Sequence, residues 1–411
     1  MNPETAAGLY ELLEQVTGYI YPNEIEIHWS ILIVAYPYLT GLVAGAFILA
    51  SLVKVFNVKE VQPVYRLSLL TALAFLLVAP MPLLLHLGRP ERFYEILLTP
   101  NPTSAMAMFG FVYAWYLMGV LLLEIWFEFR RDLVVLAQQA RPPLRWLYAA
   151  LSLFSKDISD GALAFDRKAI RAITVIGIPS AFLLHGYVGF IFGSVKANPW
   201  WSSVLMPLVF LMSAIVSGIA LVVFLYMVLT ALRRQPIDMA CLDKVTSYLF
   251  YAVIVDFSLE ALDFIHRLYE SEESVGILAK LITDKLFMSL FVLQILLGMF
   301  IPLGILVLAK SSRRFNDDLR KLLYFTAVIL IQLGIFATRW NVVIGGQLFS
   351  KSFRGLMTYK MEVMGIEGLA VTIVVLVLPF VILAAFVRLL PTQRLAEREA
   401  AGAAALSGGS R

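Results

Sequence analysis

The feature that most constrains this chain is a series of apolar segments, each long enough to cross a lipid bilayer. A spanning helix needs about 20 mainly apolar residues to cross a hydrocarbon core of about 30 Å. Of the 411 residues, 60% are hydrophobic and 15% are charged, whereas soluble domains have roughly 45–50% and about 25%. A soluble fold would expose apolar surface that drives aggregation. We therefore expect an all-α integral membrane protein with about nine spanning helices, in a range of about eight to ten: 28–56, 64–87, 104–129, 169–194, 201–232, 242–268, 283–309, 320–345 and 364–390.

The single cysteine excludes two kinds of structural site, and the remaining short segments of the sequence are expected to lie outside the spans. Cys241 is the single cysteine, which excludes an internal disulfide framework and a cysteine-ligated iron–sulfur cluster. No cleavable signal peptide is expected, because the first 20 residues are acidic and lack a basic n-region. Residues 1–27 and 142–154 are predicted to form amphipathic helices at the membrane interface. Residues 391–411 are predicted to be a disordered tail.

The distribution of Lys and Arg predicts the orientation in the membrane. The loops after the first, third, fifth and seventh spans, together with the tail, hold 23 basic residues, and the opposite side holds 9. With Arg339 inside a span, these account for all 33. Because cytoplasmic loops carry the excess of Lys and Arg, the N-terminus should face outside and the C-terminus the cytoplasm. The loop 130–168 is then cytoplasmic.

Ionisable side chains within the predicted spans gather toward the outer side. All four histidines lie in the outer half or at the outer ends of spans: His28, His86, His185 and His266. The sixth span carries Asp256, Glu260 and Asp263 at positions i, i+4 and i+7, so the three share one helix face. Arg339 lies in the outer part of the eighth span. Because charged groups at lipid depth are costly, the clustering favours a polar chamber that opens outward.

Each of these residues also has a plain structural explanation, and the sequence leaves both open. His28 and Trp29 could anchor a helix at the headgroup level. The carboxylates of the sixth span could form a structural ion pair with Arg339, or they could relay protons. Tyr113 is typical of helix packing. Glu124, near the cytoplasmic end of the third span, is most simply interpreted as a solvated carboxylate.

Among redox cofactors, quinone fits these residues better than haem does. Two-haem membrane cytochromes place two histidines at stacking spacing on one helix, and no predicted span does so. A quinone ring needs hydrogen-bond donors such as His, Tyr or Arg and a supply of protons, which histidine and buried carboxylates can deliver. The chain has no redox motif of its own. A quinone function therefore implies electron-transferring partner subunits, and we expect no haem and no metal in this chain.

Two connectors carry a resemblance to a known family. His86-Leu-Gly-Arg-Pro-Glu-Arg-Phe, followed by Asn101-Pro-Thr-Ser, resembles the signature loop of the NrfD/polysulfide reductase membrane subunits. The second connector, Asn198-Pro-Trp-Trp-Ser-Ser, and the first span from His28-Trp-Ser-Ile are similar to that family too. The segment starting Arg339-Trp-Asn resembles the longer members, which include subunits of periplasmic menaquinone reductase (Qrc-type) complexes. The resemblance covers about residues 24 to 390.

The resemblance implies two four-helix bundles and a quinone site near the outer face of the first. The domains expected are an interfacial helix (1–27), a first bundle (28–194), a second bundle (195–345), a C-terminal span (346–390) and a tail (391–411). By position, His28 and His86 would be catalytic. The family usually has Asp where His86 stands, which leaves the proton donor there open. The expected quinone-binding residues are His28, Trp29, His86, Arg89, Tyr113 and His185, and the expected proton pathway is Asp256, Glu260, Asp263, His266 and Arg339.

The function expected from this resemblance is a subunit of a respiratory oxidoreductase in the bacterial inner membrane. The protein would exchange electrons between a periplasmic, ferredoxin-like iron–sulfur subunit and the membrane pool of menaquinone or ubiquinone, reducing menaquinone with proton translocation. A further catalytic or cytochrome subunit would complete the complex, and no nucleic acid is involved. Two other classes stay open: a secondary transporter, which the internal repeat of connectors would also suit, and a passive anchor for soluble redox subunits.

Overall fold

The computed structural model describes residues 27–393 apart from residues 100, 271–273, 312–314 and 354. Within these residues the structure is helical, with one isolated β-bridge between Phe349 and Leu356. The predicted all-α class is confirmed. The interfacial helix predicted for 1–27 and the tail predicted for 391–411 lie almost wholly outside the described residues.

Eight helices among the described residues are long and apolar enough to cross a membrane, close to the predicted number of about nine. Three of them are built from consecutive helical pieces, and two of these contain a π-helical stretch (η4 and η5). The eight are α2 (Ile31–Lys54), α3–α4 (Gln62–Val78, Met81–His86), α6–η4–α7 (Ala105–Ala114, Trp115–Leu121, Leu122–Gln139), α9 (Asp160–Gly193), α10 (Met206–Leu232), α12–η5–α13 (Val275–Leu281, Ile282–Phe300, Ile301–Ser311), α14 (Asp317–Val343) and α15 (Leu369–Leu389).

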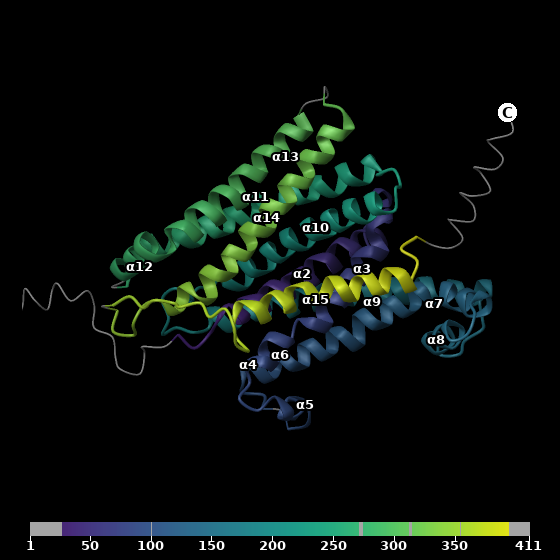
Figure 1. Cartoon of the computed structure of the whole chain (residues 1–411), viewed down its shortest axis with the longest axis horizontal. Helices are drawn as coiled ribbons and strands as arrows, with labels where there is room; N and C mark the ends of the chain where they lie inside the picture. The colour runs from purple at the N-terminus through teal and green to yellow at the C-terminus, as the bar shows by residue number, and fades with distance from the viewer. Residues whose placement is uncertain (1–26, 100, 271–273, 312–314, 354, 394–411) are drawn as a thin grey trace, which may run out of the picture.

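The remaining long helix is α11 (Met239–Glu270), which carries the carboxylates of the predicted sixth span. It is 32 residues long and packs against α10, so its length and place match those of the other long helices. Figure 1 shows it running alongside them. Two short helices lie outside the bundle: α5 (Glu95–Leu98) at one end and α8 (Leu144–Leu151) at the other.

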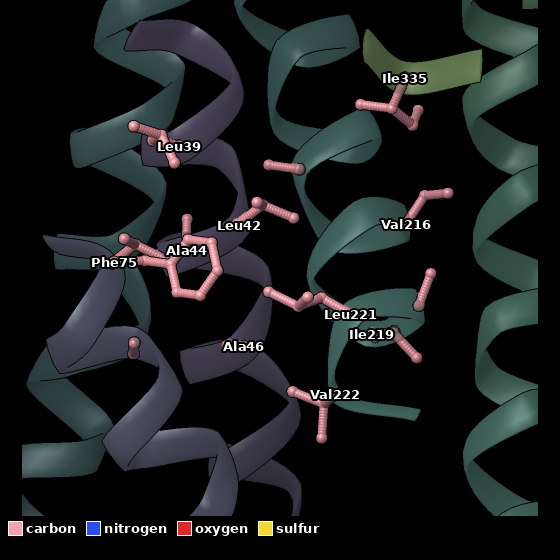
Figure 2. Close-up of a cluster of buried hydrophobic side chains, with 14 of the residues drawn as sticks. Leu39, Leu42, Ala44, Ala46, Phe75, Val216, Ile219, Leu221, Val222 and Ile335 are labelled. Carbon is pink, nitrogen blue, oxygen red and sulfur yellow. The ribbon is translucent and has the colours of Figure 1, made fainter. Parts of the chain in front are cut away.

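The helices form a bundle around α2 and α10, which cross at close range. Gly45 of α2 faces Gly218 of α10, where a Cβ on Gly45 would lie 2.0 Å from the Ala214 carbonyl oxygen. Small residues allow such backbone contact in lipid. Helices α9 and α14 each pack on both α2 and α10, whereas α3 packs mainly on α2, α11 packs mainly on α10, α7 packs on α9 and η5 packs on α14. Figure 2 shows the apolar side chains that fill the space between α2, α3 and α10.

Helix α15 packs on α3 and α2, so the last span belongs beside the first ones (Figure 1). Below, the end at which α2 begins is called the outer end, following the charge distribution, and the end with Lys54 is called the basic end. At the basic end, α7 continues to Gln139 and α9 begins at Asp160, so helix occupies both ends of the segment expected as the loop 130–168. An ion pair between Arg130 and Asp166 (2.7 Å) explains these longer helices, because it neutralises two charged side chains whose presence in the sequence suggested a loop.

Candidate functional site

A cavity of about 260 Å³ opens at the outer end of α2, and His28 and Trp201 line it. His28 is exposed. The neighbouring Trp29 stacks on Trp201 with ring centroids 5.3 Å apart, and its backbone N–H donates a hydrogen bond to Gln347 Oε1 (3.0 Å). Gln347 lines the same cavity. The structure therefore places His28 in the lining of this cavity and packs Trp29 on Trp201, which also lines it.

The other residues expected at this pocket lie elsewhere around the outer end. His86, at the end of α4, has its Nδ1 atom 2.8 Å from Glu367 Oε1 in the segment that leads into α15. Arg89 is exposed in the loop that follows. Tyr113 of α6 donates its hydroxyl proton to the Leu76 carbonyl oxygen (2.7 Å). None of these three side chains lines the cavity beside His28.

His185 is fully buried, where α9 meets α14, and its partner is Arg339. Arg339 Nη2 lies 3.2 Å from His185 Nε2 and donates a hydrogen bond to Ser213 Oγ (2.6 Å). Phe210 of α10 stacks on the His185 ring (5.7 Å), and the guanidinium lies 4.3 Å from the same Phe210 ring. Gly41 of α2 makes room for the histidine, because a Cβ there would lie 3.2 Å from the imidazole. This contact links α9 to α14, which both pack on α2 and α10.

The predicted carboxylates of α11 face a chain of amides. Gln294 Nε2 donates to Glu260 Oε2 (2.9 Å), and Asn341 Nδ2 donates to Gln294 Oε1 (2.7 Å). Asp256 and Glu260 are both buried, and one oxygen of each has no hydrogen-bond partner among the described residues. Arg339 donates to neither carboxylate, and its Nε and Nη1 atoms also have no hydrogen-bond partner. Of the two alternatives that the sequence left open, a direct ion pair with Arg339 is therefore not present among the described residues.

Asp263, one turn from Glu260, lies between an inner and an outer cavity. It accepts hydrogen bonds from Ser203 Oγ and from Arg267 Nε (2.9 Å). Asp263 and Arg267 both line an inner cavity of about 60 Å³, together with Glu260. They also line an outer cavity of about 630 Å³, which His266 borders. The predicted proton-pathway residues of α11 thus follow one another from the outer end to the buried centre.

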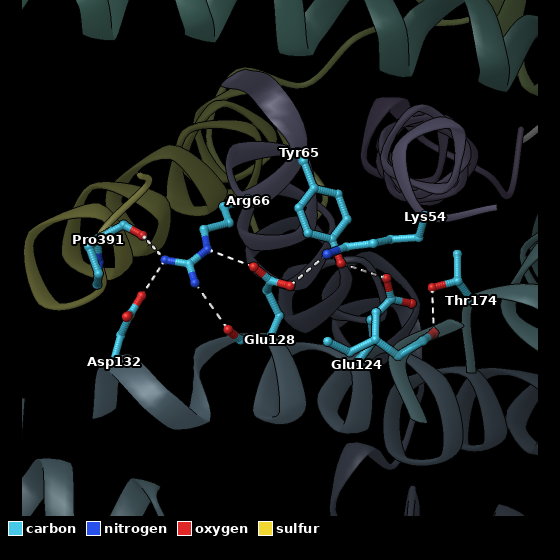
Figure 3. A network of polar contacts seen from close by, with 9 residues as sticks. Lys54, Tyr65, Arg66, Glu124, Glu128, Asp132, Thr174 and Pro391 are labelled. Atoms are coloured by element: carbon cyan, nitrogen blue, oxygen red, sulfur yellow. Dashed lines mark hydrogen bonds and ion pairs between the residues drawn. The ribbon is translucent and has the colours of Figure 1, made fainter. Parts of the chain in front are cut away.

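A second polar cluster, at the basic end, was not predicted from the sequence (Figure 3). Arg66 of α3 bonds to Glu128 (3.0 Å) and to Asp132 (2.5 Å), and Lys54 bonds to Glu128 (2.9 Å). Glu124 lies one turn before Glu128 and is 0% exposed. The interpretation of Glu124 as a solvated carboxylate is therefore wrong. The signal that could have found the cluster is the spacing of the three acids at i, i+4 and i+8 on one face of α7.

Gln294 was also missed, although it stands out in an apolar stretch from Phe291 to Met299. The described residues contain no group of three or more His, Cys, Asp or Glu side chains that could hold a metal ion. The cavity at His28 has apolar and aromatic walls beside polar side chains such as those of His28 and Gln347. Small-molecule sites generally combine apolar walls with a few polar groups in this way.

Comparison with known proteins gives one family and several relatives. The model of the family described as "Polysulphide reductase, NrfD" matches residues 22–351. A selenate reductase subunit of Mesobacillus selenatarsenatis is 31% identical over 323 residues, which cover 77% of this protein and 73% of the relative. The Hdr-like menaquinol oxidoreductase integral membrane subunit of Archaeoglobus fulgidus is 25% identical over 87% of this protein and 80% of its own length. A polysulfide reductase polypeptide of Wolinella succinogenes is 22% identical over 80% and 96%.

Proposed function

The chain belongs to the NrfD family, and from this membership we propose that it is the quinone-binding membrane subunit of a multi-subunit respiratory oxidoreductase. It lies in the bacterial inner membrane and exchanges electrons between a periplasmic, ferredoxin-like iron–sulfur subunit and the quinone pool. A further catalytic or cytochrome subunit completes the complex. The quinone is menaquinone or ubiquinone, and the reaction we favour is reduction of menaquinone.

The observation that carries this proposal is the cavity at the outer end of α2. His28 supplies an exposed imidazole, a side chain that can donate a hydrogen bond to a ring carbonyl and can act as a proton donor or acceptor. Trp201, Phe349 and Met357 give it apolar walls that suit a flat ring. One relative is a menaquinol oxidoreductase subunit, which agrees with this ligand.

His86 and Arg89 keep their proposed roles at the same end of the molecule. The contact of His86 with Glu367 gives the imidazole a carboxylate that can hold or pass on its proton. Arg89 is exposed on the loop that precedes α5, and there it can contact either the headgroup of the ligand or the electron-transferring partner. Tyr113 holds α6 against α3 through its bond to the Leu76 carbonyl oxygen, so its proposed role is to position α6.

For proton translocation we propose the polar row of α11. Protons enter the outer cavity past His266 and Asp263, and Glu260 and Asp256 hold them at the centre. Gln294 and Asn341 orient Glu260. Arg339 and His185 connect this row to α2, on the side of the quinone cavity. The support is the burial of two carboxylates that have no direct cation partner among the described residues. Such groups are costly at lipid depth and are therefore candidates for a functional role.

The test is purification of the native complex in mild detergent, with identification of the bound quinone and of the co-purifying subunits. We expect one quinone species together with an iron–sulfur subunit. A polypeptide that purifies alone and takes up a solute in vesicles would contradict the proposal in favour of a transporter. Full quinone turnover by a complex with both His28 and His86 replaced would show that the protein is only a passive anchor for its partner subunits.

A further inference from the structure

The charged side chains of the basic-end cluster neutralise one another without Glu124. The cations Lys54 and Arg66 bond to the anions Glu128 and Asp132 at 2.5–3.0 Å. Arg66 also donates to the backbone oxygens of Glu128 and Pro391. Two cations and two anions thus satisfy each other in a buried place, which is how ion pairs persist away from water. An ionised Glu124 would add an unbalanced negative charge to this set.

The surroundings of Glu124 come from four helices, and none supplies a further cation. Tyr65 of α3 donates its hydroxyl proton to Glu124 Oε1 (3.1 Å), and Thr174 of α9 lies beside the carboxyl group (Figure 3). Lys54 of α2 is already bonded to Glu128. Glu124 Oε2 is buried and has no hydrogen-bond partner among the described residues. A carboxyl group in this position is stable when protonated, since an isolated charge loses its hydration there.

The cluster has one contact with solvent and a polar continuation toward the outer end. The Lys54 side chain is 18% exposed, whereas those of Arg66, Glu128 and Asp132 are 5% exposed or less. Lys54 Nζ also lies over the Tyr65 ring, 4.3 Å from its centroid. In the other direction, three buried hydroxyl groups without a hydrogen-bond partner among the described residues lie along α2, α3 and η4, namely those of Tyr36, Thr71 and Tyr116.

We propose that Glu124 is a proton-binding carboxyl group that supplies the first bundle from the basic end, separately from the carboxylates of α11. This inference rests on the proposed quinone function for its purpose. Glu124 releases its proton in the direction of the buried Tyr116 hydroxyl, which lies on the same span nearer the outer end. The carboxylate formed keeps the Tyr65 bond, and a proton that enters past Lys54 restores the acid. No bond to carbon changes, and no electron is transferred.

The first experiment is infrared spectroscopy of the carbonyl region of the purified complex, with Glu124→Gln as the main variant. The wild-type spectrum should contain a protonated-acid band that is missing from Glu124→Gln. Tyr65→Phe should move this band to higher frequency without abolishing it, because the hydrogen bond to Oε1 is lost. Identical acid regions in wild type and Glu124→Gln would mean that Glu124 is ionised, which overturns the proposal.

The second experiment measures quinone turnover of the reconstituted complex. Glu124→Gln should lower turnover at least about tenfold, or roughly 1.4 kcal/mol at the limiting step, with the thermal midpoint and the bound quinone retained. Asp160→Asn, an exposed acid at the same end, is the matched control with normal turnover. Unchanged turnover in Glu124→Gln would exclude a role in proton supply. Because the infrared result needs no quinone, failure of the quinone proposal would leave the protonation of Glu124 as a separate finding.

Discussion

At the scale of single residues, Arg339 shows that the position of a residue in a span predicts its depth in the membrane but not its contact partners. Its depth was predictable from its place in the eighth span, and so was its nearness to the carboxylates of α11. Its partners were not, because the direction of a side chain around a helix axis depends on neighbours that are distant in sequence. The guanidinium donates to Ser213, approaches His185 and stacks on Phe210. His185 consequently lies with Arg339, away from the cavity of His28.

The roles of Glu260 and Arg339 separate under substitution. Glu260→Gln keeps the size of the side chain and can still accept the bond from Gln294, but it cannot carry a proton. We expect it to abolish proton movement in vesicles or to slow turnover at least about tenfold, roughly 1.4 kcal/mol. Arg339→Ala should also lower the thermal midpoint, because Ser213 and His185 lose a buried partner. Unchanged turnover and proton movement in Glu260→Gln and Asp263→Asn would end the relay proposal.

The quinone pocket is tested by His28→Ala and Arg89→Ala. Each should reduce quinone-coupled electron transfer at least about tenfold, the effect of losing roughly 1.4 kcal/mol in the limiting step. Assembly with the partner subunits should survive, since both side chains are exposed in this protein. The measurement is quinone reduction by the intact complex, beside the amounts of co-purified subunits. Normal rates in both variants would place the pocket elsewhere.

At the scale of helices, the crossing of α2 and α10 depends on glycine. A side chain at position 45 would meet the Ala214 carbonyl oxygen, which is backbone and cannot turn away. Gly45→Val should therefore force the helices apart and lower the free energy of unfolding by about 1–3 kcal/mol, as overpacked sites do. Gly304→Ala in α13 is the control, because nothing lies within 4 Å of its added Cβ. A thermal midpoint in Gly45→Val equal to that of the control would show that the close crossing is unimportant.

The centres of the helices could be predicted, whereas some of their ends could not. Apolar runs locate a span because lipid accepts few alternatives to a helix. They fail at the basic end, where α7 and α9 continue through charged residues. Arg130 is 4% exposed and Asp166 is 6% exposed, and their pairing lets both helices extend. A sequence read one segment at a time cannot show that pairing, because the two residues are 36 positions apart.

At the scale of the whole molecule, the orientation is still a prediction, and the protein is well suited to testing it. Cys241, the one cysteine, is fully buried, so Cys241→Ser gives a cysteine-free background. Lys156→Cys and Lys196→Cys place thiols on exposed positions at opposite ends. An impermeant reagent added outside spheroplasts should modify position 196 and spare position 156. The reverse labelling would invert the topology.

The gathering of polar residues at one end of the helices was predictable in outline, whereas their role in a site is still a prediction. The histidines and carboxylates were expected at the outer side, and His28, Asp263 and His266 do line outer cavities. The basic-end cluster was not expected, because its members look individually like ordinary cytoplasmic charges. Only their three-dimensional arrangement shows that Arg66, Glu128 and Asp132 share one buried place.

The position of α15 has a consequence for how the protein is made. This last helix packs on α3 and α2, and its end is held by Arg66 on the Pro391 carbonyl oxygen and by Tyr148 on the Leu389 carbonyl oxygen. The contact of Arg66 can form only after the ribosome has made Pro391, 325 positions later in the sequence. The earliest helices to leave the translocon therefore stay incompletely packed until α15 arrives.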